Sequence, residues 1–186
     1  MKRAFDVISA TIALIFFALP ILFIAILIKV TSIGPVFYWS DRVGRYNIIF
    51  KMPKFRTMQH ATPAVATHLL IDPDRYVTLL GKYLRKSSLD ELPQLFSIIS
   101  GNMSFVGPRP ALFNQDDLID LRTKKGIHTL TPGLTGWAQI NGRDELPTTI
   151  KVDYDEYYYT HQSFLFDIKI ILMSFLKVVK SEGVTH

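Results

Sequence analysis

The sequence predicts an α+β fold that is mainly helical, with an N-terminal membrane helix packed against one small domain. The 186 residues are the size of a single domain, and 48% of them are hydrophobic, which is enough for a sizeable core. From Val7 to Ile28 the chain carries no charge, and at about 1.5 Å per residue this run reaches roughly 33 Å, enough to cover a bilayer core. Beyond it, a short segment alternates apolar and basic residues, as strands do, and longer segments repeat apolar residues at helical spacing.

The N-terminal apolar run has two possible membrane arrangements. Hydropathy alone favours one spanning helix. However, Lys2 and Arg3 precede the run and Lys29 follows it, and positive residues favour the cytoplasmic side for both ends. Pro20 removes a backbone donor and predicts a break near Leu19 and Pro20, which leaves two limbs that are each too short to cross. A re-entrant helix broken at Pro20 meets both observations, and a kinked spanning helix is the alternative. A cleavable signal peptide is not expected, because no small-residue cleavage site follows the run.

The charge balance favours anionic partners. The chain has 21 Lys and Arg against 16 Asp and Glu, a formal net charge of +5, which suits phosphates, nucleic acid or acidic lipid. The absence of Cys excludes disulfides and thiolate metal sites. The five His residues show no metal-ligand spacing, and the motifs of P-loop ATPases, dinucleotide-binding proteins, zinc proteases and serine hydrolases are missing. Those classes of protein are therefore not expected.

The elements after the apolar run follow from periodicity and turn signals. Two strands are expected, one around Phe37 to Trp39 and one through IIFKMPKFRTM at 48–58, whose basic side chains would line one face. A loop is expected from His60 to Asp74. Four helices are predicted at Arg75 to Arg85, at about Leu92 to Gly101 with Leu92, Leu95, Phe96 and Ile99 facing the core, at about Leu112 to Lys125, and at Phe164 to Val179. The last is amphipathic and could lie at a membrane interface or close the core, and a turn-rich segment at 131–143 lies before it.

Two adjacent carboxylates, Asp90 and Glu91, allow two interpretations. In the first, Ser88 caps a helix and Glu91 bonds back to it as an S-x-x-E capping box, while Asp90 complements the helix dipole. Pro93 opposes that register, because it would lie in the interior of the helix. In the second, the helix starts nearer Leu92, and the carboxylates lie in its entry turn, where they could bind Mg²⁺ beside a phosphate. An ionised Asp90 within reach of a phosphate could then attack phosphorus.

Three arginines are candidates for holding that phosphate. Arg85, Arg109 and Arg143 each lie in or beside a turn-rich segment rather than on a regular solvated face. Prolines on both sides of Arg109, in Gly107 to Pro110, restrict its backbone, although an ordinary rigid loop would look the same. The glycines of the segment that ends at Arg143 would let its backbone approach a ligand closely.

Five sequence blocks in order resemble the bacterial sugar transferase family of monotopic phosphoglycosyl transferases, in particular its small PglC-like members. The blocks are the apolar segment broken at Pro20, KFRTM at 54–58, SLDELPQLF at 88–96, GNMSFVGPRP at 101–110 and PGLTGWAQINGR at 132–143. The resemblance covers nearly the whole chain. Members often carry Ser before the helix-breaking proline, whereas this chain has Leu19.

The resemblance implies a fold, a location and a reaction. Residues 1–33 would form the re-entrant membrane helix, and residues 34–186 would form a catalytic domain on the cytoplasmic face of the bacterial inner (plasma) membrane. Asp90 would attack the sugar-linked phosphate of a UDP-sugar and release UMP, and polyprenyl (undecaprenyl) phosphate would then accept the phosphosugar. Asp90 and Glu91 would be the catalytic residues and would bind Mg²⁺, and Lys54, Arg85, Arg109 and Arg143 would hold phosphate groups.

The alternative from a different class is a membrane-anchored adaptor without enzymatic activity. Such a protein would use its basic surface to bind anionic lipid or nucleic acid, and its binding would survive loss of both carboxylates. The resemblance favours the enzyme, for which no nucleic-acid partner is expected, and the sequence predicts no particular oligomeric state.

Overall fold

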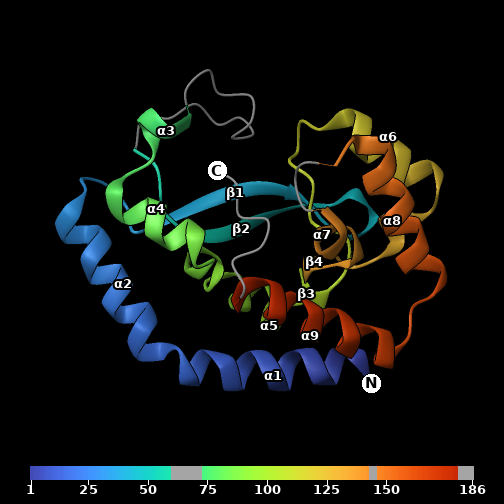
Figure 1. Ribbon diagram of the computed structural model, residues 1–186, viewed down its shortest axis with the longest axis horizontal. Helices are drawn as coiled ribbons and strands as arrows, with labels where there is room; N and C mark the ends of the chain where they lie inside the picture. Colours follow the sequence, from blue (N-terminus) through green and yellow to red (C-terminus); the bar gives the residue numbers. More distant parts are fainter. Residues whose placement is uncertain (60–72, 143–145, 180–186) are drawn as a thin grey trace.

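The computed structural model describes residues 1–59, 73–142 and 146–179, and it shows a mixed α and β fold that is mainly helical, as predicted (Figure 1). In this view (Figure 1) the first N-terminal helix runs along the bottom of the molecule and the second rises along its left edge, and the remaining elements lie above the first. In chain order the elements are α1 (Lys2–Phe16), α2 (Ala18–Thr31), β1 (Phe37–Val43), β2 (Ile49–Phe55), α3 (Pro73–Tyr76), α4 (Leu79–Lys86), α5 (Gln94–Ser100), β3 (Ser104–Val106), α6 (Asp116–Lys124), β4 (Gly133–Thr135), α7 (Trp137–Gly142), α8 (Thr148–Thr160) and α9 (Phe164–Val179).

The N-terminal helices α1 and α2 meet at an angle of 61°. The break lies at Phe17, two residues before Leu19 and within one turn of Pro20, close to its predicted position. Proline acts on the turn before it, because it cannot donate to the carbonyl four residues earlier, here that of Phe16, and its ring collides with that carbonyl. Across the described ranges, no helix alone has the length and hydropathy to cross a bilayer, whereas this bent pair taken together does.

The two predicted strands are present as β1 and β2, and the structure pairs them as an antiparallel hairpin, with Phe37 opposite Phe55 and Val43 opposite Ile49. The prediction that its basic side chains share one face is wrong. Lys51 pairs with Asp41 in solvent, whereas Lys54 points to the other face, because strand residues three positions apart alternate sides.

The helices after the hairpin differ in detail from their predictions. The helix expected from Arg75 to Arg85 is divided into α3 and α4, because Thr78 adopts an extended backbone and its hydroxyl caps α4 by accepting from the Gly81 amide. Residues 60–72 of the expected loop lie outside the described residues. The helices α6 and α9 lie where helices were predicted, although α6 begins only at Asp116.

Helix α5 ends as predicted before Gly101, whose φ of 92° suits glycine. Three of the four residues predicted to face the core do so: Leu95 is buried, and Leu92 and Ile99 are half-buried against the same cluster. Phe96 is the exception, at 55% exposed, and Ile98 is buried although it was not predicted to be.

Sequence periodicity did not indicate the parallel pair β3–β4, the short helix α7 or the helix α8. Each strand of the parallel pair is only three residues long, which is too short for a periodic pattern. In α8 the tyrosines and acidic residues alternate without one apolar stripe. Tyr158 and Asp155 are nevertheless buried, and they carry the polar contacts that fix this helix to α6 and α9.

Candidate active site

The carboxylates Asp90 and Glu91 lie in a single 3-10 turn, Leu89–Glu91, between α4 and α5. The capping-box interpretation is wrong: Ser88 has a left-handed φ of 56°, and its side chain makes no capping bond. Pro93 occupies the N-cap position of α5, where its missing amide costs nothing. The carboxylates therefore lie in the entry turn, as the second interpretation predicted.

Glu91 is the paired carboxylate of the two. Its Oε1 atom accepts hydrogen bonds from Lys54 Nζ at 2.8 Å and from Arg109 Nη2 at 3.3 Å. Burial alone would raise the pKa of Glu91, but the charges and hydrogen bonds of Lys54 and Arg109 outweigh it and hold the pKa well below its usual range. Glu91 is therefore ionised throughout the neutral range of pH.

Asp90 has the opposite environment. It is 8% exposed, and within the described residues its carboxylate accepts no hydrogen bond. Burial raises the pKa of Asp90 from 3.8 to about 6; Lys54 is the strongest opposing charge, Glu91 adds to the rise, and Arg85 and Arg109 also oppose it. At pH 7 to 8 the carboxylate is mainly ionised, and among the described residues it is stabilised by nearby charges but by no hydrogen-bond donor.

Asp90 is less accessible than a carboxylate at an open phosphate site. The cause is the packing of its neighbours in the turn, since Leu89 and Leu92 contact a buried cluster formed by Ile24, Ile28, Phe55 and Leu84. These contacts draw the turn toward the core and leave Asp90 only a small exposed area.

Three of the four predicted phosphate-binding residues lie around the carboxylates. Lys54 from β2 and Arg109 from the segment after β3 contact Glu91. Arg85 from α4 is close enough to Asp90 to interact electrostatically; its pKa is lowered by burial, and the charge of Asp90 opposes that change. Arg143 lies outside the described residues.

One residue of this site was missed by the sequence reasoning. Thr57 Oγ1 accepts a hydrogen bond from Arg85 Nε at 3.0 Å and so orients that guanidinium. Its position inside the block KFRTM, directly after β2, was the available signal.

The carboxylate pair suits a hard divalent cation whose remaining coordination positions are filled by the substrate. In the described ranges no three His, Cys, Asp or Glu side chains form a cluster able to bind a metal by themselves. Mg²⁺, however, usually takes one or two carboxylates and fills its remaining positions with water and phosphate oxygens. Asp90 and the Oε2 atom of Glu91 accept no hydrogen bond from the described residues, so their oxygens fit that role.

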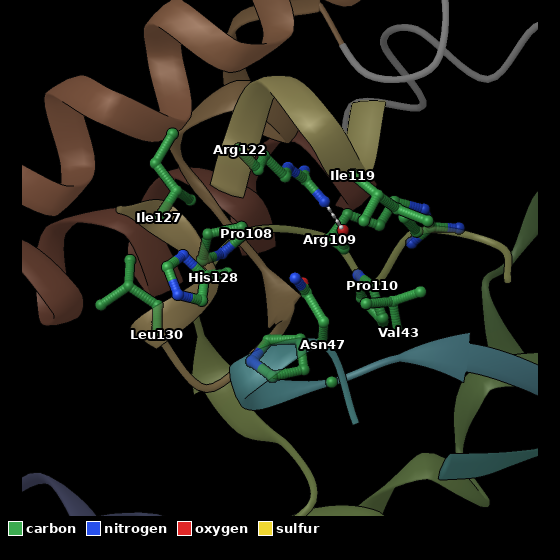
Figure 2. Close-up of a pocket in the computed structure, with 13 residues that line it drawn as sticks. Val43, Asn47, Pro108, Arg109, Pro110, Ile119, Arg122, Ile127, His128 and Leu130 are labelled. Atoms are coloured by element: carbon green, nitrogen blue, oxygen red, sulfur yellow. Dashed lines mark hydrogen bonds between the residues drawn. The ribbon is translucent and has the colours of Figure 1, made fainter. Parts of the chain in front are cut away.

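A small cavity lies behind the backbone of Arg109 (Figure 2). It has a volume of about 30 Å³, and Asn47, Pro108, Pro110 and His128 are among the residues that line it. A space of this size holds about one water molecule and is far too small for a nucleotide. The cavity is therefore part of the packing behind the site and not the substrate pocket.

Comparison with known proteins identifies the family of this chain. The sequence model of the family described as bacterial sugar transferase matches residues 1–181. The chain is 39% identical to an uncharacterized sugar transferase, EpsL, of Bacillus subtilis (strain 168), over 99% of this chain and 90% of that protein. It is 35% identical to a UDP-N-acetylgalactosamine-undecaprenyl-phosphate N-acetylgalactosaminephosphotransferase of Aeromonas hydrophila, over 98% of this chain and 44% of that protein. It is also 38% identical to a UDP-glucose:undecaprenyl-phosphate glucose-1-phosphate transferase of Escherichia coli (strain K12), over 95% of this chain and 40% of that protein.

The last two relatives are more than twice as long as the matched region, whereas EpsL is matched over nearly its whole length. The match to the family covers both the bent helix pair and every described residue of the carboxylate site. The chain belongs to the bacterial sugar transferase family.

Proposed function

We propose that this protein transfers a sugar-1-phosphate from a UDP-sugar to undecaprenyl phosphate, as the first membrane step in the synthesis of a glycoconjugate. The family and the activities named for two relatives support the reaction class. The observation that carries the proposal is the division of roles between two neighbouring carboxylates. Glu91 is ionised and held by Lys54 and Arg109, whereas Asp90 is ionised near neutral pH without a hydrogen-bond donor among the described residues.

The proposed reaction has two steps at one phosphorus atom. In the first, an oxygen of Asp90 attacks the sugar-linked phosphorus of the UDP-sugar, and the bond from that phosphorus to the bridging oxygen breaks. UMP leaves with the bridging oxygen, and the phosphosugar stays on Asp90 as an acyl phosphate. In the second, a phosphate oxygen of undecaprenyl phosphate attacks the same phosphorus and displaces Asp90. The product is undecaprenyl-diphosphate-sugar, and the carboxylate is regenerated.

The cations around the turn would stabilise the charge of the diphosphate. Arg85 of α4 and Arg109 of the segment after β3 offer guanidinium groups, and Lys54 adds a third positive charge. Mg²⁺ bound by the oxygens of Asp90 and Glu91 would supply further neutralisation of the phosphate oxygens. Glu91 would keep Lys54 and Arg109 in place. We extend the phosphate-binding role to Arg143 on its sequence match alone.

We further propose that residues 1–33 form a re-entrant membrane helix and residues 34–186 a catalytic domain on the cytoplasmic face of the bacterial plasma membrane. With 15 residues, α1 reaches only about 22 Å at 1.5 Å per residue, short of a bilayer core of about 30 Å. Both ends of the bent pair attach to the same globular unit. At one end Lys2 Nζ contacts Asp167 Oδ2 at 2.6 Å, and at the other Arg56 Nη2 donates to the Ser32 carbonyl at 3.0 Å.

Exposed apolar side chains support a membrane location. They cover the outer faces of α1 and α2 and recur on α9, an arrangement that suits partial immersion in one leaflet. They include Ile8, Ile12, Ile15, Phe16, Leu19, Leu22, Phe23, Val30, Leu165, Leu172, Phe175 and Leu176. A site at the bilayer boundary could meet a soluble donor and a lipid-bound acceptor.

The test is a covalent adduct on a defined residue. Purified protein is incubated with Mg²⁺ and each member of a panel of UDP-sugars, UMP release is measured, and intact and peptide mass spectrometry locates the added phosphosugar. One UDP-sugar should give an adduct on Asp90 that undecaprenyl phosphate removes, and Asp90→Asn should give neither adduct nor UMP. A normal adduct in Asp90→Asn would refute the assignment. Salt-sensitive binding of lipid that survives loss of both carboxylates, without UMP release, would support the adaptor instead.

A further inference from the structure

A buried ion pair lies directly beneath the backbone of Arg109. Arg122 of α6 donates from Nε at 2.9 Å and from Nη2 at 2.6 Å to Oδ2 of Asp155 in α8. The two side chains are only 9% and 2% exposed. The remaining arm of the Arg122 fork, Nη1, donates to the carbonyl oxygen of Arg109 at 2.8 Å, the contact drawn as a dashed line in Figure 2.

Stability alone is a weak reason for this arrangement. Removing two charges from water offsets most of their attraction, and apolar side chains of similar volume often serve the fold equally well. What apolar side chains cannot do is donate to a peptide carbonyl. The planar guanidinium of Arg122 donates both to Asp155 and to the carbonyl of Arg109. Because the group is rigid, the orientation that Asp155 gives it also fixes the position of the Arg109 peptide.

The other peptides of this segment are held as well. The Pro110 carbonyl accepts from Arg42 Nη1 at 3.0 Å, and the Pro108 carbonyl accepts from the Gly133 amide at 2.9 Å. Gly107 donates to the Thr135 carbonyl at 2.9 Å and packs so closely that an added Cβ would lie 2.4 Å from a backbone oxygen. Only the side chain of Arg109 extends from this fixed backbone to Glu91.

We infer that Arg122 and Asp155 are positioning residues for Arg109, and that they set the place of its guanidinium at the proposed phosphate site. The inference rests on the proposed function. A displacement of about 1 Å in a group that aligns substrate can cost about a hundredfold in rate. Loss of the pair, which leaves the Arg109 carbonyl without its donor, should therefore impair the first chemical step more than it impairs folding.

The experiment compares the buried pair with an exposed pair between the same two helices. The double variant Arg122→Met/Asp155→Leu removes both buried charges together, and Asp155→Asn is a milder second variant. The matched control is Lys125→Ala, because Lys125, the residue that follows α6, contacts Asp153 and Glu156 of α8 on the surface and not Arg109. The measured quantity is kcat/KM for UMP release, alone and combined with Arg109→Ala. Melting temperature is recorded for every variant.

We expect kcat/KM to fall at least tenfold in the double variant and less than twofold in Lys125→Ala. In the Arg109→Ala background the same double substitution should cost less than twofold, because the side chain that it positions is absent. A full tenfold loss in that background, or unchanged kcat/KM in a folded double variant, would overturn the inference. If the wild-type protein releases no UMP, the proposed function fails by itself. In that case the inference is tested by NMR. The resonance of the Arg109 guanidinium should shift in the double variant and in Asp155→Asn but not in Lys125→Ala. An unchanged resonance in the double variant would overturn the inference.

Discussion

The environment of Asp90 predicts that its ionised carboxylate destabilises the fold, so that Asp90→Asn should be more stable than the wild type at neutral pH. Folding raises the pKa of Asp90 from 3.8 to about 6. That difference corresponds to a cost of about 3 kcal/mol for the ionised form in the folded state. Because the pKa is raised on folding, protonated Asp90 contributes to the free energy of folding. That contribution is complete below pH 3.8 and is lost as the pH rises through about 6. Asparagine has nearly the same shape as the protonated acid and does not titrate.

The gain in stability should therefore depend on pH. By linkage, Asp90→Asn should exceed the wild type by about 3 kcal/mol at pH 7.5 and by about 1 kcal/mol at pH 4.5. For a domain of this size, about 3 kcal/mol corresponds to a rise in melting temperature of about 6–12 °C. Thermal unfolding of both proteins in the same detergent, without substrate or divalent cations and across this pH range, measures the difference.

Glu91→Gln is the control, since it changes the neighbouring carboxylate in the opposite environment. The pKa of Glu91 is lowered on folding, so its ionised form stabilises the protein above the unfolded pKa. Its removal should cost about 1–3 kcal/mol at neutral pH, because Lys54 and Arg109 lose a charged acceptor. Equal or lower stability of Asp90→Asn at pH 7.5, or a gain that does not shrink on acidification, would contradict the reasoning.

Three further predictions concern activity and the anchor. First, kcat/KM for UMP release should fall about tenfold per pH unit once Asp90 is protonated, since protonated Asp90 is not a nucleophile. The pKa of the metal-free carboxylate is about 6, and Mg²⁺ bound there would move the acid limb to lower pH; a pH–rate profile without an acid limb would contradict this. Second, EDTA should abolish UMP release and added Mg²⁺ should restore it; full activity after chelation would exclude the proposed metal role. Third, Leu84→Ala should lower the free energy of unfolding by about 2–5 kcal/mol, because Leu84 is 3% exposed and packs α4 against Ile24 and Ile28 of α2; an unchanged unfolding midpoint would show that this contact is dispensable.

Elements with a strong local pattern could be predicted from the sequence. The two strands of the hairpin followed from alternation and α9 from its apolar stripe, and Pro93 favoured the entry turn over the capping box. The break in the N-terminal helix was expected near Leu19 and Pro20 and lies at Phe17, because the steric effect of proline acts on the turn before it.

Features that depend on contacts distant in sequence could not be predicted. The side chain of Thr57 orients Arg85 across 28 positions, and Arg122 reaches Asp155 across 33. The burial of Asp90 likewise arises from Leu89 and Leu92, whose partners lie in α2, β2 and α4. Local periodicity cannot predict which distant segments come into contact, because tertiary packing decides those contacts.

The same packing links the N-terminal helix pair, the proposed membrane anchor, to the carboxylate site. Two adjacent carboxylates in one turn would repel each other equally if both were solvated, and their pKa values would stay close together. Here Lys54 and Arg109 fix Glu91 in its ionised form, while the contacts of Leu89 and Leu92 with the cluster that includes Ile24 and Ile28 keep Asp90 away from water. The environments drive the two pKa values apart, which is how a protein gives neighbouring acids different roles. Because two residues of that cluster belong to α2, the bent helix pair helps to create the buried environment of Asp90, the proposed nucleophile.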